Sequence, residues 1–190
     1  MQNNTENKYQ NKILTIPNIL SFFRLFLIAP MIVLYASEQY LGVLTVLVIS
    51  GISDIADGII ARKFNMISDF GKALDPIADK LTQLVVLICL ISRFPYMAIP
   101  AVFLVVKELA AGITVLISIK KTNAVKGAAW HGKLTTIVIY ITMVVHLIWF
   151  NIPTSASLIM IATCIAVMTL SFVLYIIRTA KAIRKGFYEN

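Results

Sequence analysis

Four aspartates form the pattern in this sequence that is best suited to chemistry. Asp54 and Asp57 lie three residues apart, and Asp75 and Asp79 lie four residues apart. On an α-helix, both spacings place the two carboxylates of a pair on one face. Five of the nine acidic residues in the chain fall between positions 54 and 79. We therefore expect two acidic faces, carried on successive antiparallel helices, to converge into one cluster of carboxylate oxygens.

Such a cluster is a candidate site for divalent cations, because close carboxylates repel one another when few cationic side chains lie near them. Hard oxygen ligands without Cys or His suit Mg²⁺, Mn²⁺ or Ca²⁺ and argue against zinc. Two ions that share the carboxylates would stabilise the attacking and leaving oxygens of a phosphoryl displacement. The alternatives are solvated helix ends or an ion pathway in a small cation transporter.

The residues between the two acidic pairs suit a phosphate or nucleotide ligand. Gly58 and Ala61 leave one helix face without bulk, so that a flat ring or a diphosphate could approach the backbone. Arg62 could bind a phosphate with its forked guanidinium. Gly71 keeps the start of the next helix clear. Close packing between membrane helices is the alternative explanation for these small residues.

The elements that must position these residues are membrane helices. The chain of 190 residues is 59% hydrophobic and 14% charged, with a mean hydropathy of +0.86. Soluble domains are about 45–50% apolar and about 25% charged, so this composition excludes an ordinary soluble domain. Apolar stretches, each close to the roughly 20 residues that span a bilayer, recur at about 16–36, 40–61, 73–92, 95–119, 134–152 and 155–177. The sequence therefore predicts an all-α integral membrane protein with six transmembrane helices.

The distribution of charge predicts the orientation of these helices. The chain has 17 Lys and Arg residues and nine acidic residues. The Lys and Arg residues concentrate in every second connection between the predicted helices. The other three connections together contain a single basic residue, Arg93. Because short basic loops stay on the cytoplasmic side, we expect both termini in the cytoplasm and an active site at the cytoplasmic membrane interface. The net charge of +8 is thus explained by topology and anionic lipid, and no nucleic-acid partner is expected.

Three parts are expected along the chain. Residues 1–12 are polar and form an N-terminal tail or a surface helix. Residues 13–180 contain the six predicted helices, and residues 181–190 form a basic C-terminal tail. Any chemistry is therefore expected within the membrane domain.

The acidic pairs and the residues between them form a known arrangement. The pattern Asp54-x₂-Asp57-Gly58-x₂-Ala61-Arg62-x₈-Gly71-x₃-Asp75-x₃-Asp79 resembles the full signature of the CDP-alcohol phosphotransferase family of integral membrane enzymes. The resemblance implies a six-helix, usually dimeric enzyme of the bacterial cell membrane. Such an enzyme transfers a phosphatidyl group from CDP-diacylglycerol to an alcohol and releases CMP.

The resemblance also implies roles for the residues of the signature. Asp54, Asp57 and Asp75 would be ligands of two Mg²⁺ or Mn²⁺ ions, and Asp79 would both contact metal and act as the base for the acceptor hydroxyl. The residues that would bind the CDP group are Gly58, Ala61 and Gly71 around the cytidine, with Arg62 near the diphosphate.

Two segments are most similar to phosphatidylglycerophosphate synthases and to cardiolipin synthases of this family, namely residues 16–24 and 61–80. Within the first segment, Asn18 and Arg24 could contact the donor head group. The alternative is a helix-start residue and an arginine that extends to the membrane surface.

Residues in the second half of the chain are candidates for binding the acceptor. Lys107 and Lys133, with His131, could bind the phosphate of glycerol 3-phosphate, the acceptor that we prefer. However, Thr135 and Val115 stand where those synthases usually carry cationic residues, which makes phosphatidylglycerol, the precursor of cardiolipin, the main alternative; another alcohol acceptor of the family is a further one. In contrast, the second histidine of the chain, at position 146, lies alone on an apolar face and is expected to pack rather than to bind a ligand.

Overall fold

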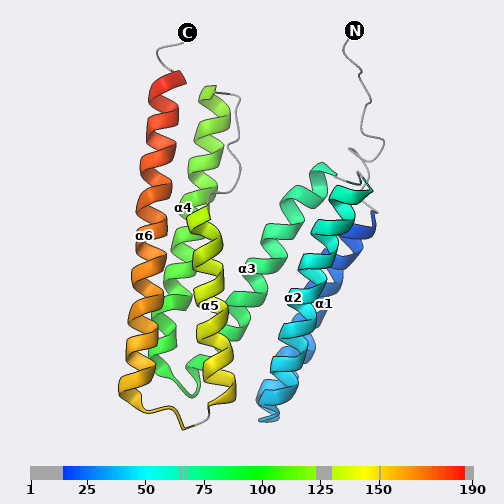
Figure 1. Ribbon diagram of the computed structural model, residues 1–190, viewed down its shortest axis with the longest axis vertical. Helices are drawn as coiled ribbons and strands as arrows, with labels where there is room; N and C mark the ends of the chain where they lie inside the picture. The colour runs from blue at the N-terminus through cyan, green and yellow to red at the C-terminus, as the bar shows by residue number, and fades with distance from the viewer. Residues whose placement is uncertain (1–14, 65, 67, 123–129, 150, 187–190) are drawn as a thin grey trace. The chain divides into compact units, whose positions relative to one another are not determined.

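The computed structural model describes residues 15–64, 66, 68–122, 130–149 and 151–186, and every regular element in these ranges is helical. The predicted N-terminal segment 1–12 lies outside the described residues. The six α-helices of the described ranges and one 3-10 turn are α1 (Ile16–Ala36), α2 (Tyr40–Lys63), α3 (Asp69–Ile91), η1 (Pro95–Met97), α4 (Ala98–Thr122), α5 (Trp130–Ile148) and α6 (Thr154–Gly186) (Figure 1). The all-α prediction is therefore confirmed.

Four stretches of the described helices are long and apolar enough to cross a membrane, namely Ile16–Ala36, Tyr40–Ala61, Pro95–Thr114 and Thr154–Arg178. In α5 the apolar stretch is shorter, Gly132–Ile148. The first half of α3 is interrupted by charged residues, which include Asp75, Asp79 and Lys80. Large apolar side chains such as Phe26 and Leu41 are 75% exposed, as expected of faces that lipid covers. The protein is thus a multi-pass membrane protein, while crossing by all six helices stays a prediction.

The chain divides into two compact units, and the first comprises residues 1–89. Here α1 and α2 form an antiparallel hairpin, connected by residues 37–39, in which Glu38 adopts a φ of 57°. The rings of Tyr35 and Tyr40 meet edge to face across the turn, with centroids 5.2 Å apart. At the other end, Thr15 caps α1 by accepting a hydrogen bond from the Asn18 backbone. The hairpin therefore fixes the start of α1 beside the end of α2.

The buried face of α1 changes character along its length. Near the start of the helix, the buried side chains other than Pro17 are polar: Asn18, Ser21 and Arg24. Near its end, the buried residues are Met31 and Tyr35. The start of α1, the end of α2 and the start of α3 lie at the same end of this unit (Figure 1). A polar site is thereby expected at that end, with an apolar core at the other.

The second unit, residues 90–190, is built around α6, which packs against both α4 and α5. His146 on α5 is buried and uses both ring nitrogens. Its Nδ1 donates to the Thr142 carbonyl at 2.8 Å, which leaves Nε2 to accept from the Ser157 hydroxyl at 2.9 Å. Its ring also packs edge to face on Phe94, with centroids 4.8 Å apart. The interpretation of His146 as a packing residue is confirmed.

Candidate metal and phosphate site

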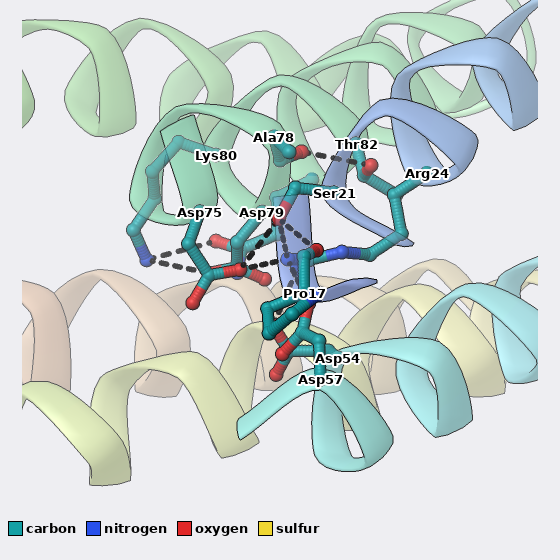
Figure 2. Close-up of polar contacts among 11 residues, drawn as sticks. Pro17, Ser21, Arg24, Asp54, Asp57, Asp75, Ala78, Asp79, Lys80 and Thr82 are labelled. Atoms are coloured by element: carbon teal, nitrogen blue, oxygen red, sulfur yellow. Dashed lines mark hydrogen bonds and ion pairs between the residues drawn. The ribbon is translucent and has the colours of Figure 1, made fainter. Parts of the chain in front are cut away.

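The structure brings together three of the four predicted aspartates. Asp54 and Asp57 on α2 and Asp75 on α3 each offer a carboxylate oxygen, and these oxygens lie within 4.8 Å of one another (Figure 2). The carboxylate of Asp57 is buried, with 3% of its side chain exposed, whereas those of Asp54 and Asp75 are 45% and 43% exposed. The cluster is therefore buried at Asp57 and accessible from outside at Asp54 and Asp75.

Arg24 of α1 lies among these carboxylates. Its Nη1 donates to Asp54, and its Nη2 donates to Asp75 and, at 2.8 Å, to Oδ2 of Asp57 (Figure 2). Only 1% of the Arg24 side chain is exposed. A buried arginine needs such partners, because a desolvated charge is costly unless it is paired. One guanidinium therefore connects all three helices of the first unit through carboxylates.

Asn18 and Ser21, which precede Arg24 on α1, make further polar contacts. Nδ2 of Asn18 donates to the hydroxyl of Ser68 at 3.0 Å, and the same hydroxyl is 3.1 Å from Oδ1 of Asn18. It also accepts a hydrogen bond from the backbone N–H of Gly71 at 3.0 Å. Ser21 contributes a hydroxyl 3.5 Å from Oδ1 of Asp75. The start of α1 is thus tied to the start of α3.

Gly71 is required by this contact. A β-carbon at residue 71 would lie 2.3 Å from Oδ1 of Asn18 and 3.0 Å from Oγ of Ser68. Real side chains do not approach so closely. The glycine therefore lets the Asn18 amide reach the start of α3, in addition to keeping the neighbouring cleft open.

Asp79 lies one turn beyond Asp75 and contacts two residues of its own helix. Nε2 of Gln83 donates to Oδ2 of Asp79 at 2.9 Å, and Nζ of Lys80 lies 3.4 Å from the same oxygen. The side chain of Gln83 is fully buried, and that of Asp79 is 20% exposed. The fourth carboxylate is therefore oriented in part by residues of α3.

A cleft of about 130 Å³ opens beside the carboxylates. Its walls include Gly58, Ala61 and Gly71, the small residues of the sequence pattern, together with Asp57 and Asp75. Drug-sized ligands occupy pockets of roughly 300–1,000 Å³, so this cleft accommodates one part of a larger ligand, such as a ring or a phosphate. Small residues and carboxylates thus face one space, as the sequence pattern predicts.

The four other predicted site residues, which are cationic or titratable, lie on α2, α4 and α5. Arg62 is in the last turn of α2 and His131 is in the first turn of α5, but their side chains lie outside the described residues. Lys107 forms an ion pair of 2.9 Å with the adjacent Glu108 on α4, and Lys133 on α5 is exposed. Both lysines belong to the second unit.

Three residues of the site were not predicted from the sequence: Ser21, Ser68 and Gln83. Two of them could have been found by helical spacing, since Ser21 lies midway between Asn18 and Arg24, and Gln83 lies four residues after Asp79. Ser68 lies in the connection before α3, where no periodicity applies. Its role depends on a contact between segments 50 residues apart.

The donor set fits a hard divalent cation. The clustered atoms are carboxylate oxygens, and no sulfur or imidazole nitrogen is among the group that the described residues form. A cationic group, the guanidinium of Arg24, already occupies the space between them. The carboxylates are thus arranged to hold positive charge.

These features define an all-helical membrane protein with an acidic cleft at one end of its first unit. The sequence profile of the CDP-alcohol phosphatidyltransferase family matches residues 14–179. Because this match covers most of the chain, the protein belongs to that family.

Individual relatives are similar over shorter lengths. The CDP-diacylglycerol--glycerol-3-phosphate 3-phosphatidyltransferase of Rickettsia bellii is 36% identical over 113 residues, which cover 57% of this chain and 62% of the relative. The protein of the same name from Rickettsia typhi is 34% identical over 113 residues, 57% of this chain and 63% of the relative. The cardiolipin synthase (CMP-forming) of Streptomyces coelicolor is 42% identical over 89 residues, 44% of this chain and 41% of the relative. The chain therefore matches less than two thirds of the length of these relatives.

Proposed function

We propose that the protein transfers a phosphatidyl group from CDP-diacylglycerol to the hydroxyl of an alcohol and releases CMP. The observation that carries this proposal is the convergence of Asp54, Asp57 and Asp75 beside a cleft lined by Gly58, Ala61 and Gly71. Membership of the CDP-alcohol phosphatidyltransferase family supports the same reaction class.

The three clustered carboxylates would hold the metal, with Asp79 contacting it from the next turn of α3. We propose two Mg²⁺ or Mn²⁺ ions, which when bound would neutralise the diphosphate and the charge that develops during phosphoryl displacement. In the cleft, Gly58, Ala61 and Gly71 would accommodate the cytidine. Arg62 and Asn18 would contact the donor at its diphosphate and head group.

Asp79 is the proposed base. Its carboxylate would accept the proton of the acceptor hydroxyl as that oxygen attacks the lipid-side phosphorus of the donor. The bond from this phosphorus to the CMP oxygen breaks, and CMP leaves with the electron pair. The hydrogen bond from Gln83 at 2.9 Å supports this role, because it fixes the orientation of the carboxylate.

The membrane setting suits both substrates. The diacylglycerol part of the donor would stay among lipids while its CDP group reaches the cleft. We propose that all six helices cross the bilayer, that both termini are cytoplasmic, and that the cleft opens at the cytoplasmic interface. The basic connections predicted from the sequence support this orientation. From the resemblance to the family, we also propose that the active form is a homodimer.

Glycerol 3-phosphate is the preferred acceptor, which would make phosphatidylglycerophosphate the product. The longer similarity to the Rickettsia proteins, over 113 residues, supports this choice. Lys107 and Lys133, with His131, would bind the acceptor phosphate. Phosphatidylglycerol is the second candidate, because Lys107 is already paired with Glu108 at 2.9 Å and Thr135, in the place of a second lysine, is buried.

Product analysis tests this proposal. The purified protein would be incubated with CDP-diacylglycerol, Mg²⁺ or Mn²⁺, and one acceptor at a time: glycerol 3-phosphate, phosphatidylglycerol, inositol phosphate or serine. Mass spectrometry of the lipid and measurement of CMP then identify the reaction. We expect phosphatidylglycerophosphate and CMP in equal amounts. Cardiolipin instead would support the second acceptor, and metal transport into vesicles without CMP release would favour a cation transporter and overturn the enzyme.

A further inference from the structure

The guanidinium of Arg24 occupies the space in which the three clustered carboxylates would hold a metal ion. Its Nη2 is 2.8 Å from Oδ2 of Asp57 and also donates to Asp75, while Nη1 donates to Asp54. Metal ions bind carboxylate oxygens at about 2.0–2.6 Å. An ion among these oxygens would therefore lie in contact with the guanidinium, which two positive charges disfavour. The arginine and the metal compete for the same ligands.

The cleft adjoins the carboxylates that Arg24 binds, since Asp57 and Asp75 line it. Asn18 and Ser21, on the same buried face of α1, line the cleft that also contains Gly58 and Ala61. The Nε of Arg24 is buried and has no hydrogen-bond partner among the described residues. The long side chain could thus turn toward the cleft and gain partners there. A planar guanidinium fits two phosphate oxygens at once, which makes a diphosphate its natural partner in that position.

We infer that Arg24 exchanges partners during the catalytic cycle. Before metal binds, its guanidinium holds Asp54, Asp57 and Asp75 together. When metal takes these carboxylates, Arg24 moves to the cleft and binds the diphosphate of the nucleotide donor. This inference rests on the proposed function for the identity of the donor, but its metal step does not. Arg24 is then both a stabiliser of the metal-free site and a binding residue for the substrate.

The exchange predicts changes in Mn²⁺ and CDP affinity that a purely structural role of Arg24 would not produce. Arg24→Gln removes the competitor, so the variant is expected to bind Mn²⁺ more tightly than the wild type, by about tenfold. The same variant is expected to bind CDP about tenfold more weakly at saturating Mn²⁺, because a charged partner of the diphosphate is lost. Cytidine, which has no phosphate, is expected to bind equally well to both proteins.

Equilibrium binding measures these effects directly. Free Mn²⁺ would be followed by electron paramagnetic resonance in the purified, metal-free protein, and CDP and cytidine by calorimetry at saturating Mn²⁺. Arg93→Gln is the matched control, because Arg93 is exposed and lies in the second unit. Its affinities for Mn²⁺ and CDP are expected to equal those of the wild type. Arg24→Met, which also removes the positive charge, provides the same comparison if Arg24→Gln does not fold.

The results distinguish the inference from its rivals. Weaker or unchanged Mn²⁺ binding in the Arg24 variants would overturn it, because Arg24 would then support the metal site or be irrelevant to it. An equal loss of CDP and cytidine affinity would also overturn it, since the effect would not concern the diphosphate. Failure of the proposed function appears elsewhere, in the absence of a phospholipid product from a protein whose binding follows the expected pattern.

Discussion

The amide oxygen of Asn18 on α1 lies 2.3 Å from the position that a β-carbon would occupy at Gly71 on α3. The position of the Asn18 amide therefore depends on the absence of a side chain at Gly71. Asn18 is 1% exposed and exchanges hydrogen bonds with Ser68, so its amide has little room to move. The start of α3, which leads to Asp75, is positioned by this contact.

Gly71→Ala is therefore expected to destabilise the protein by about 1–3 kcal/mol, the usual cost of overpacking. The methyl group would displace the Asn18 amide from Ser68 and shift Asp75. Thermal unfolding in detergent would measure the loss, and Gly51→Ala is the control, because a β-carbon there meets nothing within 4 Å. Asn18→Ala in the Gly71→Ala background should restore part of the stability. If the two substitutions simply add, the proposed contact is wrong.

The sequence was sufficient to predict α1 and α2 closely. The predicted stretch 16–36 coincides with α1, and 40–61 ends two residues before α2 does. The third and sixth stretches are too short, because hydropathy falls at charged residues while the helices continue. α3 begins at Asp69, and α6 extends to Gly186, so the predicted C-terminal segment 181–190 begins within a helix.

What the sequence could not predict is the partner of each polar residue. The donor contact expected of Arg24 stays a prediction, but its contacts with the three aspartates were not predicted. That placement depends on how α1 aligns against α2 and α3, which is set by contacts such as that of Met31 in the buried core rather than by local spacing. The hydrogen bond from Gln83 to Asp79 was likewise not predicted.

Asp79→Asn is expected to lower turnover by about 10²–10⁴-fold, the contribution of a positioned general base. The protein should remain folded, because the asparagine side chain still accepts the hydrogen bond from Gln83. CMP release and thermal unfolding, measured together, test both statements. Glu38→Gln, at the exposed turn between α1 and α2, is the control and should retain full activity. Wild-type turnover in Asp79→Asn would exclude Asp79 as the base.

Gln83→Met should reduce kcat by roughly tenfold or more, since a hydrogen bond to a charged group contributes about 1.5–3 kcal/mol. The KM for the donor should change little, because Gln83 contacts Asp79 and not the cleft. Methionine preserves the volume of this buried side chain. Steady-state kinetics separate the two constants. A loss of thermal stability with normal kcat would show that Gln83 serves packing alone.

Metal removal should abolish turnover. Chelation with EDTA is expected to stop CMP release, and Mg²⁺ or Mn²⁺ should restore it, because the clustered ligands are hard carboxylate oxygens. Asp57→Asn should weaken Mn²⁺ binding, as this buried carboxylate is replaced by a neutral amide. Titration of Mn²⁺ followed by electron paramagnetic resonance provides the affinity. Full activity after exhaustive chelation would contradict a metal-dependent mechanism.

Lys133→Ala tests how the acceptor is recognised. Lys133 is exposed near the start of α5, so its attraction to a phosphate is screened by solvent and is expected to contribute up to about 1 kcal/mol. The KM for glycerol 3-phosphate should rise roughly fivefold, and the KM for an uncharged alcohol should stay constant. Arg178→Ala, which removes an exposed charge from α6, is the control. Equal increases for charged and uncharged acceptors would mean that Lys133 acts on the fold or the membrane rather than on the acceptor phosphate.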